Sequence, residues 1–388
     1  MTSVDPIELA QALIRRPSVT PADAGAMDVV EQALAGLGFV CRRMAFGGIE
    51  NLYARLGTAS PNLCFGGHTD VVPVGDADAW RQGPFDGTVV DGVLFGRGAV
   101  DMKGGIAAFV GAVSSVLQEG PLAGSVSLII TGDEEGSFHE GAKGVVAALL
   151  KSGEGIDHCV VGEPTSSAVL GDMIKVGRRG SLNAVITAQG VQGHVAYPHR
   201  AANPIPVLVR LLAKLQARQL DDGYPEFQPT NLEVTDLEVG NPAENVIPAR
   251  ARAMLNIRFN PTWQGAELVA WLQSACEEAQ AEFPEGSGAT VTVTTRISGE
   301  AFYTAPGPFV TTVAQAVQEV TGVAPELSTS GGTSDARYFR ALCPVVEFGL
   351  VGTTMHMVDE RTPVSELQAL TRIYTAMIER YFETFRAA

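Results

Sequence analysis

Two polar side chains stand at the end of an apolar run in the first quarter of the chain. The segment LCFGGHTDVVPVG breaks on two glycines and then carries His68 and Asp70. In an extended chain residues i and i+2 project to the same side, so this imidazole and carboxylate can face one point. The pair is compatible with a metal site, with half of a catalytic triad, or with an ordinary polar strand end.

Polar residues follow four other apolar runs, each of which is predicted to be a strand. They are Asp101 after GVLFGRGAV, Glu134 and Glu135 after SVSLIITGD, Glu163 after DHCVVG, and His356 after PVVEFGLVGTTM. In open α/β sheets ligand sites form at the carboxyl ends of strands, so residues far apart in sequence can converge there. One polar residue after a strand is ordinary loop chemistry. Two histidines and several carboxylates at successive strand ends indicate a functional site.

Imidazole and carboxylate ligands suit zinc or a similar divalent metal, and the lack of paired thiols argues against a structural, cysteine-rich zinc site. Five such ligands exceed the usual three of one catalytic zinc, whereas two metals that share one carboxylate would use them all. A metal pair of this kind lowers the pKa of a water toward neutrality. Of the neighbours Glu134 and Glu135, one can then ligate while the other takes a proton from the water.

Other catalytic motifs are weak or missing in the sequence. GRGAVD begins like a dinucleotide fingerprint, but its sixth position is Asp101. The sequence holds no GxxxxGK[ST], HExxH or GxSxG motif. Ser330 in STSGGTSD has no assignable base, so a serine nucleophile is not favoured.

Arginines in two segments indicate that the substrate is anionic. GRRGSL contains Arg178 and Arg179, and LNIRF contains Arg258. Clustered arginines in so acidic a chain suit bidentate capture of a carboxylate. The glycine-rich turn TSGGTSD precedes a predicted helix, and its free N–H groups can also hold a carboxylate.

His194 follows a glycine at a predicted strand end, in GVQGHVAYPH, which is a poor place for a core histidine. A histidine in a mobile second domain could reach the scissile carbonyl on closure and stabilise its developing oxyanion.

Composition excludes several classes of partner. The 388 residues carry a formal charge of −16, which argues against nucleic acid or an anionic membrane. No apolar run reaches the length of a transmembrane helix. The N-terminus is predicted to be a helix capped by Asp5 with Pro6 at its first position, and not a signal peptide. Five scattered cysteines without a CxxC pair fit a reduced, cytoplasmic protein.

The order of predicted elements indicates an α/β fold with an insertion. Residues 1–180 and 295–388 show the alternating helix and strand patterns of a layered α/β domain. Residues 181–294 follow the order β-α-β-β-α-β, which is the pattern of a split βαβ sandwich. We therefore expect one α/β domain interrupted by a smaller one, within the usual range of domain sizes.

Taken together, these motifs resemble those of the M20-type family of dinuclear zinc amidohydrolases, over nearly the whole chain. The matching segments are GHTDVVP, GRGAVDMKGG, GDEEG, VGEPT, GRRGSL, GHVAYPH, NVIP, SGGTSDARYF and TMHMVDE. The resemblance implies a zinc-exopeptidase-like catalytic domain, with a mixed sheet flanked by helices, and an inserted ferredoxin-like lid or dimerisation domain. It also implies a homodimer with two Zn²⁺ per subunit, for which Co²⁺ can substitute.

Within this family the motifs are most similar to those of enzymes that hydrolyse N-succinyl-LL-2,6-diaminopimelate in lysine and diaminopimelate synthesis. The alternatives are another N-acyl-amino-acid deacylase, of the acetylornithine type, or a carboxypeptidase. A catalytically dead dimeric binding protein is a more distant alternative, because every expected ligand is present in the sequence. Met357 stands where relatives frequently carry a lysine, but it is not an expected ligand.

The resemblance also implies a role for each residue at the strand ends. One zinc would be held by His68, Asp101 and Glu163, and the other by Asp101, Glu135 and His356, with Asp101 as the bridge. Glu134 would be the general base and acid, Asp70 would orient His68, and His194 would serve the oxyanion from the partner subunit. The peptide bond after Asp101 is expected to be cis. The implied substrate-binding residues are Lys175, Arg178, Arg179, Ser181, Tyr197, Asn245, Arg258, Gly331, Gly332 and Thr333.

Overall fold

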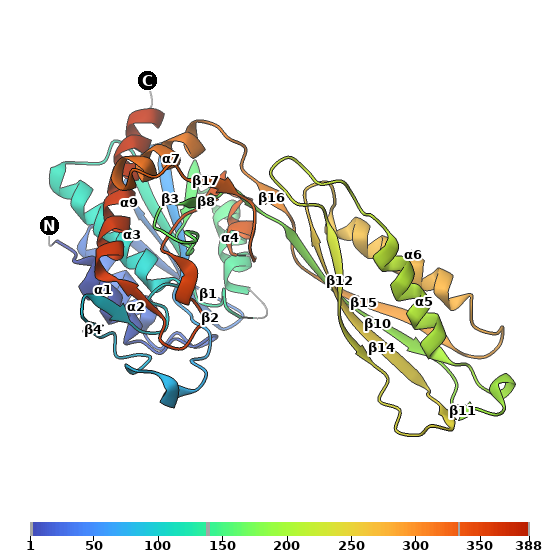
Figure 1. Cartoon of the computed structure of the whole chain (residues 1–388). Helices are drawn as coiled ribbons and strands as arrows, with labels where there is room; N and C mark the ends of the chain where they lie inside the picture. Colours follow the sequence, from blue (N-terminus) through green and yellow to red (C-terminus); the bar gives the residue numbers. More distant parts are fainter. Residues whose placement is uncertain (1–2, 137–139, 333, 387–388) are drawn as a thin grey trace. The chain divides into compact units, whose positions relative to one another are not determined.

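The chain forms two compact units in a computed structural model that describes residues 3–136, 140–332 and 334–386 (Figure 1). Unit 1 comprises Met1–Gly177, Thr304–Ser328 and Ser334–Ala388, and unit 2 comprises Arg178–Tyr303 and Thr329–Thr333. The assignment of a catalytic role to the first and of a lid or dimerisation role to the second stays a prediction.

Unit 1 is built on an eight-stranded mixed sheet with the order β1-β2-β6-β3-β7-β18-β8-β17. The central strands β6, β3, β7 and β18 run parallel to one another, whereas β1 and β2 are antiparallel additions. The strands are β1 (Val40–Phe46), β2 (Ile49–Leu56), β3 (Asn62–His68), β6 (Ser125–Thr131), β7 (His158–Val161), β8 (Met173–Lys175), β17 (Glu326–Ser328) and β18 (Val345–Glu347).

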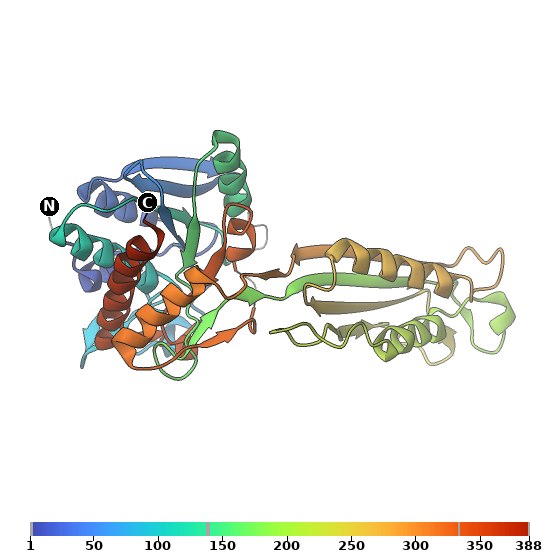
Figure 2. The ribbon, with the colours of Figure 1, turned by 90° about the horizontal axis from the view of Figure 1, so that it is seen from above.

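Helices cover both faces of this sheet. Figures 1 and 2 show α3 and α9 on one side of the sheet and α4 on the other. Asp5 caps the first helix by accepting the main-chain N–H of Ile7 at 2.7 Å, as predicted. The helices are α1 (Pro6–Ile14), α2 (Ala26–Gly36), α3 (Lys103–Glu119), α4 (Glu140–Ser152), α7 (Pro308–Thr321), α8 (Ala336–Phe339) and α9 (Val364–Phe385). A second, three-stranded sheet joins β4 (Val89–Val90), β5 (Val93–Phe95) and β19 (Arg361–Pro363).

Strand β3 is buried along its whole length, and its glycines allow neighbours to approach from both faces. A Cβ on Gly66 would lie 2.6 Å from the Phe339 ring, and one on Gly67 would lie 2.7 Å from the terminal methyl of Met102. Larger side chains would push α8 and the start of α3 away from the strand. The two glycines of LCFGGHTD therefore fix the position of the strand end that carries His68.

Unit 2 is a four-stranded antiparallel sheet, in the order β12-β14-β10-β15, with two helices on one face (Figure 1). This order is that of a ferredoxin-like βαββαβ fold. Its elements are β10 (Gly180–Gln189), α5 (Pro204–Ala217), β12 (Asn231–Glu238), β14 (Arg250–Phe259), α6 (Gly265–Gln280) and β15 (Thr290–Gly299). Two short strands, β11 (Gly193–His194) and β13 (Val246–Ile247), form a separate antiparallel pair.

The two faces of the unit 2 sheet differ in chemistry. Leu182, Ile186 and Ile257 belong to the apolar core that packs beneath α5 and α6. Residues of the opposite parity, such as Asn183 and Asn256, project from the other face because side chains alternate along a strand. Unit 2 therefore presents a polar sheet face that its own helices do not cover.

The predicted fold class, a mixed sheet flanked by helices with an inserted ferredoxin-like domain, is confirmed. The strands β9 (Gly177–Arg178) and β16 (Phe302–Tyr303) lie where the chain passes from one unit to the other. Within the described ranges, no helix has both the length and the apolar character needed to cross a bilayer.

Candidate metal centre

The polar residues predicted at strand ends meet at one edge of the unit 1 sheet. His68 ends β3, Glu134 and Glu135 follow β6, and Glu163 follows β7. These three strands are parallel neighbours, so their carboxyl ends lie at the same edge. Donor atoms of His68, Asp101 and Glu135 lie within 4.8 Å of one another, as do those of His68, Glu134 and Glu163.

Asp101 lies between the two histidines and faces each with a different oxygen. Its Oδ1 is 3.3 Å from His68 Nε2, and its Oδ2 is 3.2 Å from His356 Nε2. A further carboxylate accompanies each imidazole: Glu163 Oε1 lies 3.8 Å from His68 Nε2, and Glu135 Oε1 lies 2.8 Å from His356 Nε2. This is the arrangement expected of a carboxylate that bridges two metal ions.

Spacing and burial both fit a pair of divalent ions. Ligand atoms bound to one tetrahedral zinc at about 2.0–2.2 Å lie roughly 3.3–3.6 Å from each other, close to the separations around Asp101. His68 Nε2 and Asp101 Oδ1 are buried and have no hydrogen-bond partner. Because a buried polar atom without a partner is costly, these two atoms fit the role of metal ligands.

The electrostatics of the cluster favour a bound cation. Burial alone would lower the pKa of His68, but the carboxylates of Asp101 and Asp70 raise it well above its usual value. Hydrogen bonds to Asp101 and Glu135 raise the pKa of His356 to about 10. The carboxylates therefore favour positive charge at both imidazoles, and divalent metals would supply that charge.

Asp70 supports two parts of the cluster at once. Its main-chain carbonyl oxygen accepts a hydrogen bond from His68 Nδ1 at 2.9 Å, so that Nε2 faces Asp101. Its carboxylate accepts the main-chain N–H groups of Glu134 at 3.1 Å and Glu135 at 3.0 Å. The carboxylate is 3.5 Å from His68 Nδ1. Asp70 was predicted to orient His68. The structure shows that its carboxylate also positions the segment that carries Glu134 and Glu135.

Sequence reasoning missed a buried ion pair behind the cluster. Glu360 is fully buried. Its carboxylate accepts a hydrogen bond from Arg97 Nη1 at 2.8 Å and others from the main-chain N–H groups of Gly98, Val100 and Asp101 at 2.9–3.1 Å. Glu360 thereby fixes the loop that ends in the bridging carboxylate. The Asp101–Met102 peptide bond is cis, as expected.

Arg97 also makes hydrogen bonds to the loops that follow His68 and His356. Its guanidinium donates to the carbonyl oxygens of Met357 at 3.1 Å and Pro73 at 3.2 Å, and it stacks over the Trp80 ring. The only sequence signal was an acidic residue four positions after His356, which a surface loop explains equally well.

Most of the predicted substrate-binding residues belong to unit 2. Arg178 Nη1 donates to the carbonyl oxygen of Gly332 at 3.2 Å. Gly331 has a φ of +104°, and a Cβ there would lie 2.7 Å from Arg178 Nη1. The glycine turn is therefore packed against Arg178, while Thr333 lies outside the described residues. Lys175 belongs to unit 1, where it is buried and its Nζ donates to Ser328 Oγ at 3.3 Å.

Arg179 and Arg258 are close neighbours with amide partners. Arg179 Nη1 donates to Asn231 Oδ1 at 3.0 Å, and Arg258 Nε donates to Asn256 Oδ1 at 3.0 Å. Burial and then the adjacent Arg179 charge lower the pKa of Arg258. Among the residues that the structure describes, no carboxylate lies within ion-pair distance of either guanidinium. Two half-buried cations without a counter-ion suit an anionic ligand.

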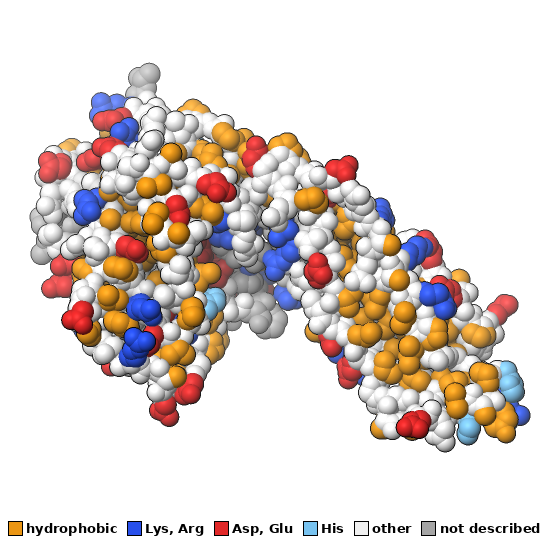
Figure 3. Space-filling model, in the orientation of Figure 1, with side chains coloured by type: hydrophobic (Ala, Val, Ile, Leu, Met, Phe, Trp, Pro, Cys, Tyr) orange, Lys and Arg blue, Asp and Glu red, His pale blue; other side chains and the backbone are white. Residues whose placement is uncertain are grey.

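His194, Tyr197 and Asn245 lie together at another part of unit 2. Val195 N–H donates to the Asn245 carbonyl at 3.0 Å, and the rings of His194 and Tyr197 are 5.6 Å apart. All three side chains are exposed, and Figure 3 shows histidine side chains at the surface of the end that carries β11. Strand β10 runs from Gly180 to Gln189, so these residues are about 30 Å from the arginines.

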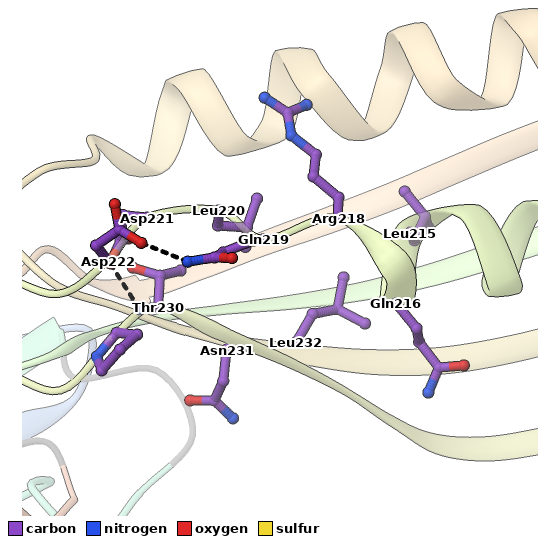
Figure 4. Close-up of a pocket in the computed structure, with 11 residues that line it drawn as sticks. Leu215, Gln216, Arg218, Gln219, Leu220, Asp221, Asp222, Thr230, Asn231 and Leu232 are labelled. Carbon is purple, nitrogen blue, oxygen red and sulfur yellow. Dashed lines mark hydrogen bonds between the residues drawn. The ribbon is translucent and has the colours of Figure 1, made fainter.

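A cavity of about 380 Å³ in unit 2 holds no predicted site residue. It lies between the end of α5 and the start of β12 (Figure 4), and its carboxylate Asp221 is fully used by the N–H groups of Gly223, Thr230, Asn260 and Trp263. Figure 4 also shows Asn231 and Leu232 pointing to opposite sides of β12, which puts Asn231 on the uncovered sheet face.

Comparisons with known proteins agree with this geometry. The model of peptidase family M20/M25/M40 matches residues 64–380. A succinyl-diaminopimelate desuccinylase of Phenylobacterium zucineum is 65% identical over 380 residues, covering 98% of this chain and 99% of the relative. One of Caulobacter vibrioides is 63% identical over 383 residues, covering 99% and 97%.

A solved structure with the same fold is an M20 family metallo-carboxypeptidase of Sulfolobus solfataricus, with a TM-score of 0.78 and 17% identity over 97% of this chain and 99% of that one. The chain belongs to peptidase family M20/M25/M40.

Metal binding should release protons. Asp101 and Glu135 raise the pKa of His356 to about 10, so this imidazole holds a proton at pH 7.5 in the metal-free cluster. Ligation requires a neutral imidazole, so loading with Zn²⁺ should release at least the proton of His356, and metal affinity should fall as the pH falls. Calorimetry in buffers of different ionisation enthalpy measures the number of protons released. His356→Ala should reduce it by about one, and a heat independent of the buffer would contradict the assignment.

Replacing Glu360 should lower both the stability of the protein and the metal affinity of the cluster. Glu360→Gln leaves the buried Arg97 without its counter-ion and sets an amide N–H against main-chain N–H groups, which should lower the free energy of unfolding by about 3–5 kcal/mol. Because the Asp101 loop loses its support, metal affinity should fall about 10–100-fold. Chemical denaturation and metal titration measure both quantities. The exposed Glu383→Gln is the matched control, and equal behaviour of the two variants would refute the role of Glu360.

Proposed function

We propose that this chain hydrolyses N-succinyl-LL-2,6-diaminopimelate to succinate and LL-2,6-diaminopimelate, a step of lysine and diaminopimelate synthesis. The observation that carries the proposal is identity of 51–65% over nearly the full length with relatives named succinyl-diaminopimelate desuccinylase. Arg179 and Arg258, whose guanidiniums are held by amides, support it, because both halves of this substrate carry carboxylates.

Two Zn²⁺ ions are the proposed metals, with Co²⁺ as a substitute. His68, Asp101 and Glu163 would hold one ion, and Asp101, Glu135 and His356 the other, in keeping with the two faces of Asp101. When bound, the metals would supply Lewis acidity, which polarises the amide carbonyl and makes a water acidic enough to attack at neutral pH.

Glu134 is the proposed proton carrier. Burial and the neighbouring Glu163 charge raise the pKa of Glu134 well above its usual value, which suits a group that must both take and give a proton near neutral pH. It takes a proton from the attacking water and gives it to the nitrogen of the leaving amine as the amide C–N bond breaks. Asp70 keeps the segment in place through its hydrogen bonds to two main-chain N–H groups.

His194 is the proposed donor to the oxyanion. Its Nδ1 accepts the main-chain N–H of Ala196 at 3.0 Å, so the neutral ring carries its proton on Nε2. The exposed ring therefore offers an N–H to the negative oxygen that develops as water adds to the carbonyl. Lys175, Arg178, Arg179, Ser181, Arg258 and the turn of Gly331, Gly332 and Thr333 are proposed to bind the substrate's carboxylates, with Tyr197 and Asn245 close to His194.

We propose a homodimer, and the dimensions of unit 2 support it. The arginines lie near the first residues of β10, whereas His194 lies beyond its last residue, roughly 30 Å away. One small substrate cannot contact both groups within a single chain. We therefore propose that His194 and Asn245 of a second copy complete the site.

The proposed compartment is the cytoplasm, since all five cysteines are free thiols and fit a reducing environment.

The substrate assay is the decisive test. Protein reconstituted with zinc should hydrolyse N-succinyl-LL-2,6-diaminopimelate with a much higher kcat/KM than N-acetyl-L-ornithine or a dipeptide, and chelation should abolish turnover. Succinate release measures the rate. A preference for the acetyl substrate or for the peptide would assign the chain to another deacylase or to a carboxypeptidase.

Glu134→Gln is the control for the chemistry. It should keep both metals and lose about 10²–10⁴-fold in kcat, because a carboxamide cannot carry the proton. Activity that resists chelation, or normal turnover by this variant, would overturn the mechanism. Less than one metal per chain together with no turnover would point to a binding protein.

Mixing two inactive variants should restore activity if the site is shared between copies. His194→Ala and Glu134→Gln chains, unfolded and refolded together in equal amounts, should recover about a quarter of the wild-type rate, since half of the dimers then hold one intact site of two. Glu134→Gln mixed with Glu163→Ala is the control and should recover nothing. No recovery in the first mixture, or a monomer by light scattering, would refute the shared site.

A further inference from the structure

We propose that Asn256 is a positioning residue for substrate recognition: it fixes the guanidinium of Arg258 so that its terminal N–H groups are presented to a substrate carboxylate. This inference rests on the proposed function, because it assigns the anionic substrate to the same arginine. The observations that carry it all lie on the uncovered face of the unit 2 sheet.

Asn256 and Arg258 are two residues apart on β14, so their side chains project from the same face. Arg258 Nε donates to Asn256 Oδ1 at 3.0 Å. This bond uses the inner N–H of the guanidinium and restricts the rotation of its plane. The four outer N–H donors, which bind a carboxylate in the bidentate geometry, are left to face a ligand.

The orientation of the Asn256 amide is itself determined by its neighbours. Its Nδ2 donates to Asn183 Oδ1 at 3.0 Å and to Ser181 Oγ at 3.2 Å. Asn183 in turn donates through its own Nδ2 to Ser298 Oγ at 2.9 Å, so the Asn183 oxygen must face Asn256. Each amide thus has its nitrogen directed across the sheet, and the last free oxygen, that of Asn256, is directed at Arg258.

The partner of Arg258 is suited to binding because it is neutral. A carboxylate at position 256 would form an ion pair with the guanidinium and compete with an anionic ligand. An amide oxygen fixes the same N–H and leaves the positive charge uncompensated. Arg179 follows the same pattern, since its Nη1 donates to the amide oxygen of Asn231. Both guanidiniums are therefore held by amides. Glu233 lies opposite Asn256 in the β12–β14 register and accepts a hydrogen bond from Asn231 Nδ2 at 3.4 Å, but among the described residues no carboxylate is within ion-pair distance of either guanidinium.

The test is a kinetic comparison of variants with a double-mutant cycle. Asn256→Ala should raise KM for N-succinyl-LL-2,6-diaminopimelate about tenfold and leave kcat within about threefold, because an oriented guanidinium contributes to binding and not to the chemical step. In an Arg258→Ala background the same substitution should change KM little, because Asn256 acts through Arg258. Asn256→Asp should also raise KM, although it keeps an acceptor for Nε.

Controls separate this role from a structural one and from the proposed function. Thr187→Ala, on the same face of β10, should leave both constants unchanged, and the melting temperature of Asn256→Ala should match that of the wild type. Equal KM for wild type and Asn256→Ala, or additive effects in the cycle, would overturn the proposal. If the wild type does not turn over the substrate, the proposed function fails. Calorimetric binding of succinate and of LL-2,6-diaminopimelate then decides the role of Asn256 by the same comparison.

Discussion

Carboxylates repel one another, and the fold of unit 1 must hold five of them around two imidazoles. Asp101 is the centre of this arrangement, since each of its oxygens faces a different histidine. The loop that carries Asp101 is held by a buried carboxylate, Glu360, whose own charge is met by Arg97. A buried network of hydrogen bonds thus stabilises the gathered negative charge, and the charge that remains would favour bound metal cations.

The order of the sheet places this cluster. Strands β6, β3 and β7 are adjacent and parallel, so one histidine and three glutamates emerge at a single edge although they span nearly a hundred positions in the sequence. The glycines of β3 allow α3 and α8 to pack closely on both sides of that strand. His68 is therefore fixed by packing, and its ring is turned by the carbonyl oxygen of Asp70.

Much of this arrangement could be predicted from the sequence, because strand periodicity and polar residues after strands are local signals. The metal-ligand candidates, the cap at Asp5 and the βαββαβ order of unit 2 all depend on such signals. Contacts between residues far apart in the chain leave no local signal in the sequence. Arg97 and Glu360 are 263 positions apart, and each alone has the pattern of a surface residue. The carboxylate of Asp70 was expected at His68, and its bonds to Glu134 and Glu135 depend on the meeting of two loops.

Each unit gathers side chains of like charge and holds them with hydrogen bonds that do not neutralise the charge. In unit 1 a carboxylate cluster is stabilised by a neighbouring ion pair that does not neutralise it, and in unit 2 a guanidinium pair is held by amides that do not neutralise it either. Neutral or remote partners fix a charged group while leaving its charge available. A chain with a net charge of −16 repels anions over most of its surface, so recognition of the proposed anionic substrate would depend on the few cations without a carboxylate partner. In our proposal, amide partners such as Asn256 and Asn231 orient those cations without forming an ion pair with them.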